Sequence, residues 1–556
     1  MGRVLAIGLD GYEPSLEDAL VAAGELPAIA KLREASARFS LDHGSAQRTG
    51  LAWEHFSSGL APEDARRFAA VRFDPRRYAA WQEGTGLEPF PARLAARTVV
   101  FDAPYFDLAR APRVRGVVGW GAHDPGVATR SEPNELLAEL DARFGSYPAA
   151  EWIYGFAWPS AQRCARMGEA LAHAADVRAR AARWLFAERL PDWDLAITVV
   201  SEPHSAIEGL WHGVDASHPL HHLPSSAPAG EGLRAVYRAA DRLVAELTGA
   251  FPDAAVVVFS MGGMGANRSD AASMFLLPEL LHRHAFGRAC ASIPAEWTAA
   301  ERGLPMLGEG ESWSERMIAL FAQPEPSDQP GALRRAIAGA VPEPVKGLVR
   351  RALGRSEEDR RPLALGWMPA SHYRAHWPAM RAFALPSFYD GRVRVNLAGR
   401  ESRGVVAVSD YAATVDAIES LVRACSDPNT GASVVDFVER PAHGRDPREL
   451  GDTEADLVFV WHGPLAFDHP ALGRIGPVPF RRTGGHTGRY GMAYLRGAGI
   501  AAGDRGVCSS FDVVPTLLDL LGELPASGLS GATLLGRAPI ALHPATDRQI
   551  ARESAR

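Results

Sequence analysis

The run Val4-Leu-Ala-Ile-Gly-Leu-Asp10-Gly11 decides the fold class of this 556-residue chain. An uninterrupted apolar run that ends at once in an acidic residue and a glycine is typical of a strand buried on both faces of a parallel sheet. Similar runs follow at 98–101, 195–200, 254–259 and 457–461, with helical patterns between them at 15–35, 169–188 and 233–250. Because strands alternate with helices, the sequence predicts a three-layer α/β/α sandwich around a mostly parallel sheet.

Composition places the chain among globular proteins. It is 47% hydrophobic and 22% charged, with 59 basic and 66 acidic residues and a formal net charge of −7. These proportions exclude a disordered or collagen-like chain. Because the balance is mildly acidic, we expect no nucleic-acid-binding surface.

The sequence also predicts where the protein is found. It contains no run of about 18 apolar residues that could span a bilayer, and the first strand is not preceded by the basic segment of a secretory leader. The four cysteines, Cys164, Cys290, Cys425 and Cys508, are scattered and form no CxxC pair. We therefore expect a cytoplasmic protein in a reducing compartment, without membrane contact.

The length of the chain predicts a core with an insertion, because single cores stop growing at about 250–300 residues. Residues 274–384 are rich in Pro, Arg and Glu, include the charged run 350–361 and lack a buried-strand pattern. We expect this segment to form a cap over the strand ends. The core would then comprise residues 1–273 and 385–556, with β-structure over 383–406 and a helix over 410–424.

Polar residues follow several of the predicted strands directly. Asp10 ends the first run, Glu202 and His204 follow the run 195–200, and Ser260-Met261-Gly262-Gly263 closes the run 254–259. Open parallel sheets bind ligands beyond the carboxyl ends of their strands, so we expect a site at this edge.

Several segments resemble the type I phosphodiesterase and nucleotide pyrophosphatase branch of the alkaline phosphatase superfamily. They are residues 4–11, 26–33, Arg48-Thr49-Gly-Leu-Ala-Trp53, 58–62, 395–400, Gly484-Gly-His486, Gly488 and 511–517. The likeness covers roughly three quarters of the chain, the insertion excepted. It implies an alkaline phosphatase-like sandwich, two divalent metal ions, a Thr or Ser nucleophile and a small-molecule phosphate ester as substrate.

The resemblance assigns roles to three residues near the N-terminus. Asp10 corresponds to a carboxylate ligand of the nucleophile-side metal, an interpretation that its position at a strand end favours over a turn residue that caps the next helix. Thr49 aligns with the nucleophile at the start of a helix expected over 50–57, where a plain N-cap threonine also fits. Arg48 is placed to bind a phosphate through two hydrogen bonds.

The metal ligands depart from the family pattern. His204 stands where the family has Asp, and Glu208 where it has His, but the i, i+4 spacing still puts both on one helix face. Together with His486 they form a two-His, one-carboxylate set for a single divalent ion, zinc first, with manganese or iron as alternatives. Because further histidines lie at 218, 221 and 222, a purely hydrogen-bonded histidine cluster is the competing interpretation.

The second metal ion is expected to be lost or weakly bound. Ser260-Met261-Gly262-Gly263 stands in place of the family's Ser-Asp-His-Gly, and neither Met nor Gly binds a hard cation. Asn267 or Asp270 would have to substitute for the missing ligands. Four further polar side chains are candidates to line the pocket, with His123 also a possible substitute ligand or general acid: Glu202, His123, Asp124 and His212.

Other enzyme classes lack their motifs. The sequence contains no GxGxxG after a strand, no P-loop and no sulfatase Cys/Ser-x-Pro-x-Arg motif. We therefore expect a metal-dependent hydrolase or transferase that acts on phosphate mono- or diesters through Thr49, with a mononuclear metal site. Two alternatives stay open: a catalytically inactive binding protein of the same fold, and a His/His/Glu metalloenzyme of different chemistry, such as an Fe(II) enzyme. Nothing in the sequence predicts an oligomeric state.

Overall fold

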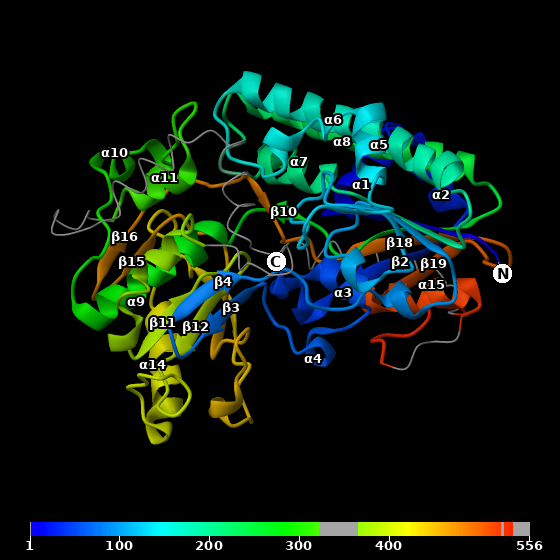
Figure 1. Cartoon of the computed structure of the whole chain (residues 1–556). Helices are drawn as coiled ribbons and strands as arrows, with labels where there is room; N and C mark the ends of the chain where they lie inside the picture. Colours follow the sequence, from blue (N-terminus) through cyan, green and yellow to red (C-terminus); the bar gives the residue numbers. More distant parts are fainter. Residues whose placement is uncertain (1, 322–364, 524–527, 537–556) are drawn as a thin grey trace, which may run out of the picture.

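The computed structural model describes residues 2–321, 365–523 and 528–536, and a nine-stranded sheet runs through its larger part (Figure 1). Along the sheet the strands are β19 (Gly503–Ser509), β2 (Ala37–Asp42), β18 (Gly491–Arg496), β9 (Ala255–Ser260), β1 (Val4–Leu9), β8 (Leu195–Val200), β5 (Thr98–Phe101), β6 (Arg115–Val118) and β7 (Arg130–Glu132). All neighbours from β9 to β6 are parallel, whereas β18 is antiparallel to both of its neighbours and β7 is antiparallel to β6. The prediction of a mostly parallel sheet is confirmed.

Strand β1 lies at the centre of this sheet and is buried along its whole length. Its side chains alternate between two separate cores, with Leu5, Ile7 and Leu9 on one face and Val4 and Ala6 on the other. The first face is covered by α1 (Pro14–Ala22), α2 (Pro27–Glu34), α5 (Leu136–Phe144), α6 (Ala161–Trp184), α7 (Glu202–Leu210) and α8 (Ser226–Ala250). The second is covered by α3 (Ala52–Ser58), α4 (Pro62–Ala65) and α15 (Val513–Leu521), which completes the predicted three-layer sandwich (Figure 1).

The helical pattern at 15–35 forms two helices instead of one. Gly24 adopts a positive φ of 75° after α1, and Pro27 begins α2. Proline is favoured in the first turn of a helix and disrupts a helix interior, which explains the break. None of the helices within the described ranges combines the length and apolar character that a bilayer crossing requires.

A second hydrophobic core lies beside the sandwich, around a four-stranded antiparallel sheet. Its strands are β11 (Ala382–Leu385), β12 (Gly391–Val395), β14 (Leu457–Trp461) and β13 (Val435–Glu439), and α9 (Leu277–Phe286) and α14 (Tyr411–Arg423) belong to the same unit. The expectation that 457–461 joins the parallel sheet is therefore wrong. Strand β14 is an inner strand of this second sheet, and its burial produces the same apolar run.

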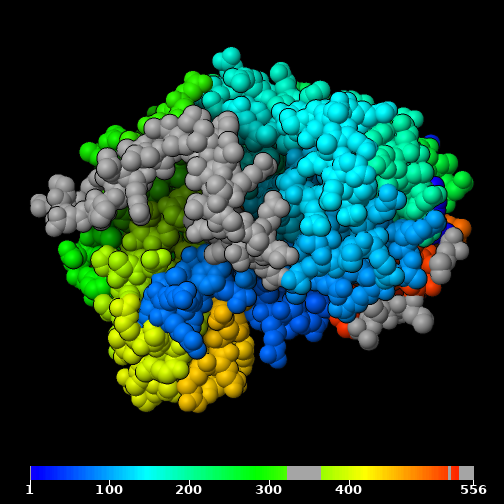
Figure 2. All heavy atoms as spheres, in the orientation of Figure 1, coloured from blue at the N-terminus to red at the C-terminus, as the bar shows by residue number. Residues whose placement is uncertain are grey.

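The second core draws on distant parts of the chain. It includes residues of the hairpin β3 (Val71–Asp74) and β4 (Ala79–Gln82), and Figure 2 shows this blue segment against the yellow surface of the second unit. Within the predicted cap, the structure shows α10 (Ala295–Thr298), α11 (Trp313–Ile318) and the 3-10 turns Pro369–Tyr373 and Trp377–Ala379. The charged run 350–361 lies outside the described residues. Side chains on both sides of residue 384 share this core, and the predicted division at 273 and 384 stays a prediction.

Two further short strand pairs lie outside the two large sheets. The pair β15 (Phe467–His469) and β16 (Gly473–Ile475) belongs to the second unit. The pair β10 (Gly265–Ala266) and β17 (Gly484–Gly485) is antiparallel and lies where the chain leaves and re-enters the sandwich. This second pair brings residues that follow β9 next to His486.

Candidate functional site

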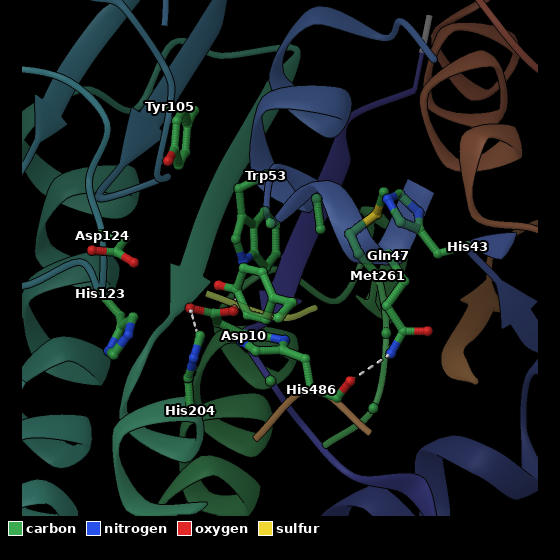
Figure 3. A pocket seen from close by; sticks show the side chains of 16 residues that line it. Asp10, His43, Gln47, Trp53, Tyr105, His123, Asp124, His204, Met261 and His486 are labelled. Atoms are coloured by element: carbon green, nitrogen blue, oxygen red, sulfur yellow. Dashed lines mark hydrogen bonds and ion pairs between the residues drawn. The ribbon is translucent and has the colours of Figure 1, made fainter. Parts of the chain in front are cut away.

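A pocket opens at the carboxyl ends of β1, β8 and β9 (Figure 3). Among the residues predicted for the site, it brings together Asp10, His123, Asp124, His204 and His486. These residues come from segments far apart in the chain, and the convergence follows from the shared direction of the parallel strands.

Asp10 is held at the end of β1 by a tight turn. Gly11 has a φ of +61°, and a Cβ atom there would lie 2.4 Å from Met264 Sδ and 2.9 Å from His204 Cβ, so only glycine fits. The close approach sets Asp10 Oδ2 3.0 Å from His204 Nδ1, while Oδ1 accepts a hydrogen bond of 2.7 Å from Trp53 Nε1. Both carboxylate oxygens therefore already have protein partners.

The charge of Asp10 is maintained despite its burial. Burial raises the pKa of this carboxyl, but the charge of His204 and the hydrogen bond from it outweigh that effect and leave the pKa below its ordinary value. A carboxylate that accepts the Nδ1 proton of an imidazole leaves the Nε2 lone pair free for a metal ion. The geometry thus makes Asp10 a partner of His204, whereas the sequence suggested a direct metal ligand.

His204 and Glu208 lie one turn apart on α7, as their spacing predicted. His204 Nε2 is 3.4 Å from Glu208 Oε1, and His123 Nε2 from the loop after β6 is 3.8 Å from the same oxygen. The rings of His123 and His204 stack with centroids 3.8 Å apart. One ligand atom from each of His123, His204 and Glu208 lies within 4.8 Å of the others. These three residues are the candidate metal set.

The chemical state of the set suits a divalent ion. His123 Nδ1 lies 2.7 Å from Ile153 O; a carbonyl only accepts, so Nδ1 carries the proton and Nε2 a free lone pair. Burial, followed by the charge of His204, lowers the pKa of His123 to about 3, so this ring is neutral. His204 Nε2 is buried without a hydrogen bond from any described residue. The neutral His123 imidazole, the unpaired His204 Nε2 atom and the buried Glu208 carboxylate are ligand types that fit zinc.

His486 lies beside the set and is not part of it. Its ring packs edge-on against His204, with centroids 4.8 Å apart, and against Tyr389, with centroids 4.5 Å apart. Burial lowers its pKa well below the usual value, and the neighbouring charges of His204 and Arg482 act in the same direction. Its Nε2 atom is buried and has no hydrogen bond within the described ranges, so it is available to a ligand in the pocket.

Arg482 is a site residue that the sequence analysis missed. Its guanidinium Nη1 forms an ion pair with Glu208 Oε1, and its Nε lies 2.8 Å from Asp270 Oδ2. Burial lowers the pKa of Arg482 to about 10, which still leaves the group charged at neutral pH. The one available signal was its position just before Thr483-Gly-Gly-His486. The site therefore contains a fixed cation next to the candidate metal carboxylate.

Asp270 and Asn267, which were considered as ligands of a second metal ion, have other partners in the structure. Asp270 binds Arg481 and Arg482, and the Asn267 amide donates to Gly484 O at 3.2 Å. Met261 and Gly262 form part of the pocket wall. Within the described part of the chain, the group of metal-ligating side chains at this edge of the sheet is therefore His123, His204 and Glu208.

The structure does not bring Thr49 and Arg48 into the pocket. Thr49 ends a 3-10 helix, Gly44–Thr49, where its hydroxyl donates to Ala46 O at 2.7 Å. It lines a smaller cavity, and Tyr389 lines both that cavity and the pocket. The Arg48 guanidinium pairs with Glu439.

The helix expected over 50–57 begins two residues late, at Ala52. The reason is Gly50, which adopts a left-handed φ of 71° and interrupts the helical path after Thr49. The aromatic ring of Tyr389 packs against Gly50, where a Cβ atom would lie 2.1 Å from it. Thr49 therefore does not stand at the start of a helix whose free N–H groups could bind an anion.

Of the four predicted pocket side chains, two line the pocket and two do not. His123 and Asp124 do, and Asp124 accepts a hydrogen bond of 3.1 Å from Tyr154. Glu202 is fully buried in an ion pair with Arg178, 2.9 Å away, and that network holds the strand ends together. His212 bonds to Ser225 at 3.1 Å beneath α7.

The chain matches no family model and no curated protein, but solved structures resemble it along nearly its whole length. Phosphonoacetate hydrolase from Sinorhizobium meliloti 1021, in complex with phosphonoformate, has 14% identity and a TM-score of 0.47 over 94% of this chain and 95% of that one. Murine ectonucleotide pyrophosphatase/phosphodiesterase 5, in an inactive form with AMP, has 12% identity and a TM-score of 0.45 over 96% and 98%. The alkaline phosphatase PafA has 10% identity and a TM-score of 0.48 over 96% and 99%. These likenesses concern the fold alone.

Proposed function

We propose that this protein is a metal-dependent hydrolase of phosphate esters that uses a single divalent ion held by His123, His204 and Glu208. The observation that carries the proposal is the approach of these three ligand atoms to within 4.8 Å of one another at the carboxyl edge of the sheet, where His123 and His204 also line the pocket. Two imidazoles and a glutamate are a ligand set of zinc hydrolases, so zinc is the first candidate. Manganese and iron accept the same ligands.

An anionic substrate is supported by the charge of Arg482. The guanidinium is anchored through Asp270, and its Nη1 atom reaches Glu208 inside the site. A planar guanidinium is well suited to bind phosphate oxygens. The expectation that the substrate is a phosphate ester comes from the sequence resemblance. The buried Arg482 cation suits such an anionic substrate.

Different residues around the site have different roles in the proposed reaction. When bound, the ion would polarise a phosphoryl oxygen and promote ionisation of the attacking group. Asp10 Oδ2 orients the His204 ring from 3.0 Å away from its Nδ1 atom, and the Ile153 carbonyl orients His123 by accepting a hydrogen bond from its Nδ1. His486 and Tyr389 close the pocket with their edge-on rings and restrict water.

Water is the attacking group in this proposal. Attack by Thr49, as the sequence resemblance implies, requires its hydroxyl to leave the Ala46 carbonyl and Tyr389 to move from between the two cavities. Attack by water requires neither change. A phosphorylated Thr49 in protein quenched during turnover would overturn this part of the proposal.

The experiment combines metal analysis with a substrate screen. Protein purified without chelator is assayed for bound metal and for cleavage of p-nitrophenyl phosphate and bis-p-nitrophenyl phosphate, alongside His204→Ala and the exposed-histidine control His222→Ala. We expect the metal of the pocket and the turnover to be lost only in His204→Ala. Turnover that survives in His204→Ala would contradict the proposal, and so would metal-free wild-type protein, which would favour an inactive binding protein. Iron-loaded protein that consumes oxygen would favour the Fe(II) alternative.

A further inference from the structure

A second group of metal-ligating side chains lies in the second unit, away from the pocket. It consists of His282 on α9, Cys290 in the loop after that helix and His376 just before the turn Trp377–Ala379. One ligand atom from each lies within 4.8 Å of the others. We propose that His282, Cys290 and His376 form a structural zinc site, independent of the activity proposed for the pocket.

His282 is oriented as a metal ligand. Helix α9 ends at Gly287, whose φ of +66° turns the chain back so that Arg288 O lies 3.1 Å from His282 Nδ1. Because a carbonyl oxygen can only accept a hydrogen bond, Nδ1 carries the proton and Nε2 keeps its lone pair. A histidine fixed in this way by a backbone carbonyl is the usual arrangement around bound zinc. The ring is also buried, so its orientation is fixed.

Cys290 is held in place through its backbone. The carboxylate of Glu279, which is fully buried, accepts hydrogen bonds from the Cys290 N–H at 3.2 Å and the Ala291 N–H at 3.3 Å. The same carboxylate accepts a hydrogen bond of 2.7 Å from the Tyr373 hydroxyl. One side chain therefore fixes α9, the cysteine loop and the segment that carries His376. The thiol forms no disulfide and is free to bind a metal.

His376 is the third member of the group and comes from a later part of the chain. Its ring packs edge-on to His282, with centroids 4.8 Å apart, and also contacts Phe286, with centroids 5.6 Å apart. His376 and Cys290 are only partly buried, which leaves a path for the ion from solvent. One thiolate and two imidazoles select a borderline-soft ion such as zinc over magnesium or calcium.

An ion bound at this site would stabilise the second unit. An ion bound there would join α9 to the segment around Tyr373 and Trp377, both of which are buried in the second core. A metal that binds only the folded chain stabilises that chain. The site would thus act as a crosslink within the second unit, without contact to the pocket.

Cobalt distinguishes the two metal sites, because only this one contains sulfur. We expect titration of the metal-free full chain with Co(II) to produce a thiolate-to-cobalt charge-transfer band in the near ultraviolet. The band should persist in His204→Ala and in the control Cys425→Ala, and disappear in Cys290→Ser. Absence of the band in wild-type protein, or its persistence in Cys290→Ser, would overturn the proposal.

A second variant guards against misfolding of Cys290→Ser. His376→Ala changes a partly exposed side chain, and we expect it to weaken zinc binding at this site by more than about tenfold while circular dichroism stays as in wild type. In the same preparation, zinc should raise the Tm of His204→Ala but no longer that of the double variant His204→Ala/His376→Ala. An equal rise in both would contradict a site at His376.

Discussion

The guanidinium of Arg482 forms a buried ion pair with the carboxylate of Glu208, the same carboxylate that approaches His123 and His204. Asp270 anchors the arginine from the other side. A divalent ion at Glu208 and the Arg482 side chain therefore compete for one carboxylate, and ion binding would release Nη1 for an anionic ligand. Metal binding and phosphate binding are then coupled through a single side chain.

The first prediction concerns this competition. Arg482→Met should destabilise metal-free protein by about 3–5 kcal/mol, because it removes the guanidinium that pairs with the buried Glu208 carboxylate and one of the two arginines that pair with Asp270. Zinc should then restore more stability to this variant than it adds to wild type. The measurement is the Tm with and without zinc, and the control is Arg481→Met, which keeps the pair between Arg482 and Glu208. An equal zinc effect in wild type and Arg482→Met would show that the ion does not bind at Glu208.

The second prediction concerns Asp10. Asp10→Asn should weaken zinc binding by about 10–100-fold, because the amide is a poorer acceptor for the His204 Nδ1 proton. Competition with a chromophoric chelator measures the affinity. Trp53→Phe, which removes the hydrogen bond to Asp10 Oδ1 together with part of a buried ring but leaves the contact between Asp10 and His204, should have a smaller effect on zinc affinity. Unchanged affinity together with lost turnover would instead place Asp10 in contact with the substrate.

The third prediction concerns the attacking group. Thr49→Val should retain turnover within a few-fold and lose about 1 kcal/mol of stability, since it removes the hydrogen bonds with Ala46 and Leu51. Thr49→Ser, which keeps the hydroxyl, should behave as wild type in both respects. Steady-state kinetics and urea unfolding separate the two effects. Complete loss of turnover in Thr49→Val alone would return the nucleophile role to this residue.

The fourth prediction concerns pH. Burial lowers the pKa of His43 to about 4, below the value of about 6.5 in an unfolded chain. The unfolded state therefore binds the proton first, so the stability that neutral His43 contributes is present above pH 6.5 and is lost as the pH falls toward 4. Relative to His43→Gln, wild-type protein should lose more than about 1 kcal/mol between pH 7 and pH 5. Urea unfolding at both pH values measures this difference, and parallel curves would contradict it.

The sequence predicted correctly those features that depend on the pattern of adjacent residues. The buried run at 4–9 and the acidic residue after it placed β1 and Asp10 correctly, because burial on both faces and a strand-end turn are written in adjacent residues. The run 457–461 was assigned to the wrong sheet, since an inner strand of either sheet is equally apolar. Arg482 was missed because its partner Glu208 is distant in sequence and meets it only in the folded chain, where the N–H of the next residue, Thr483, donates to Glu208 O at 2.8 Å.

The position of Thr49 shows a different limit. Its neighbours match a nucleophile segment, but one left-handed residue, Gly50, redirects the chain and a ring from the second unit, Tyr389, occupies the space in front of it. Neither event leaves a periodic signal in sequence. His123, by contrast, was identified as a candidate from its place after a strand, and the structure puts it in the metal set.

The late strand β18 has a consequence for synthesis of the protein on the ribosome. It lies between β2 and β9, and β2 meets its other neighbour, β19, later still. At about 5–20 residues per second, translation from residue 260 to residue 491 takes on the order of ten seconds or more. Throughout that time β9 has an open edge and β2 has no partner at all, and such edges pair readily with other chains. We therefore expect nascent chains to need shielding by chaperones until the second unit has emerged and the last strands close the sheet.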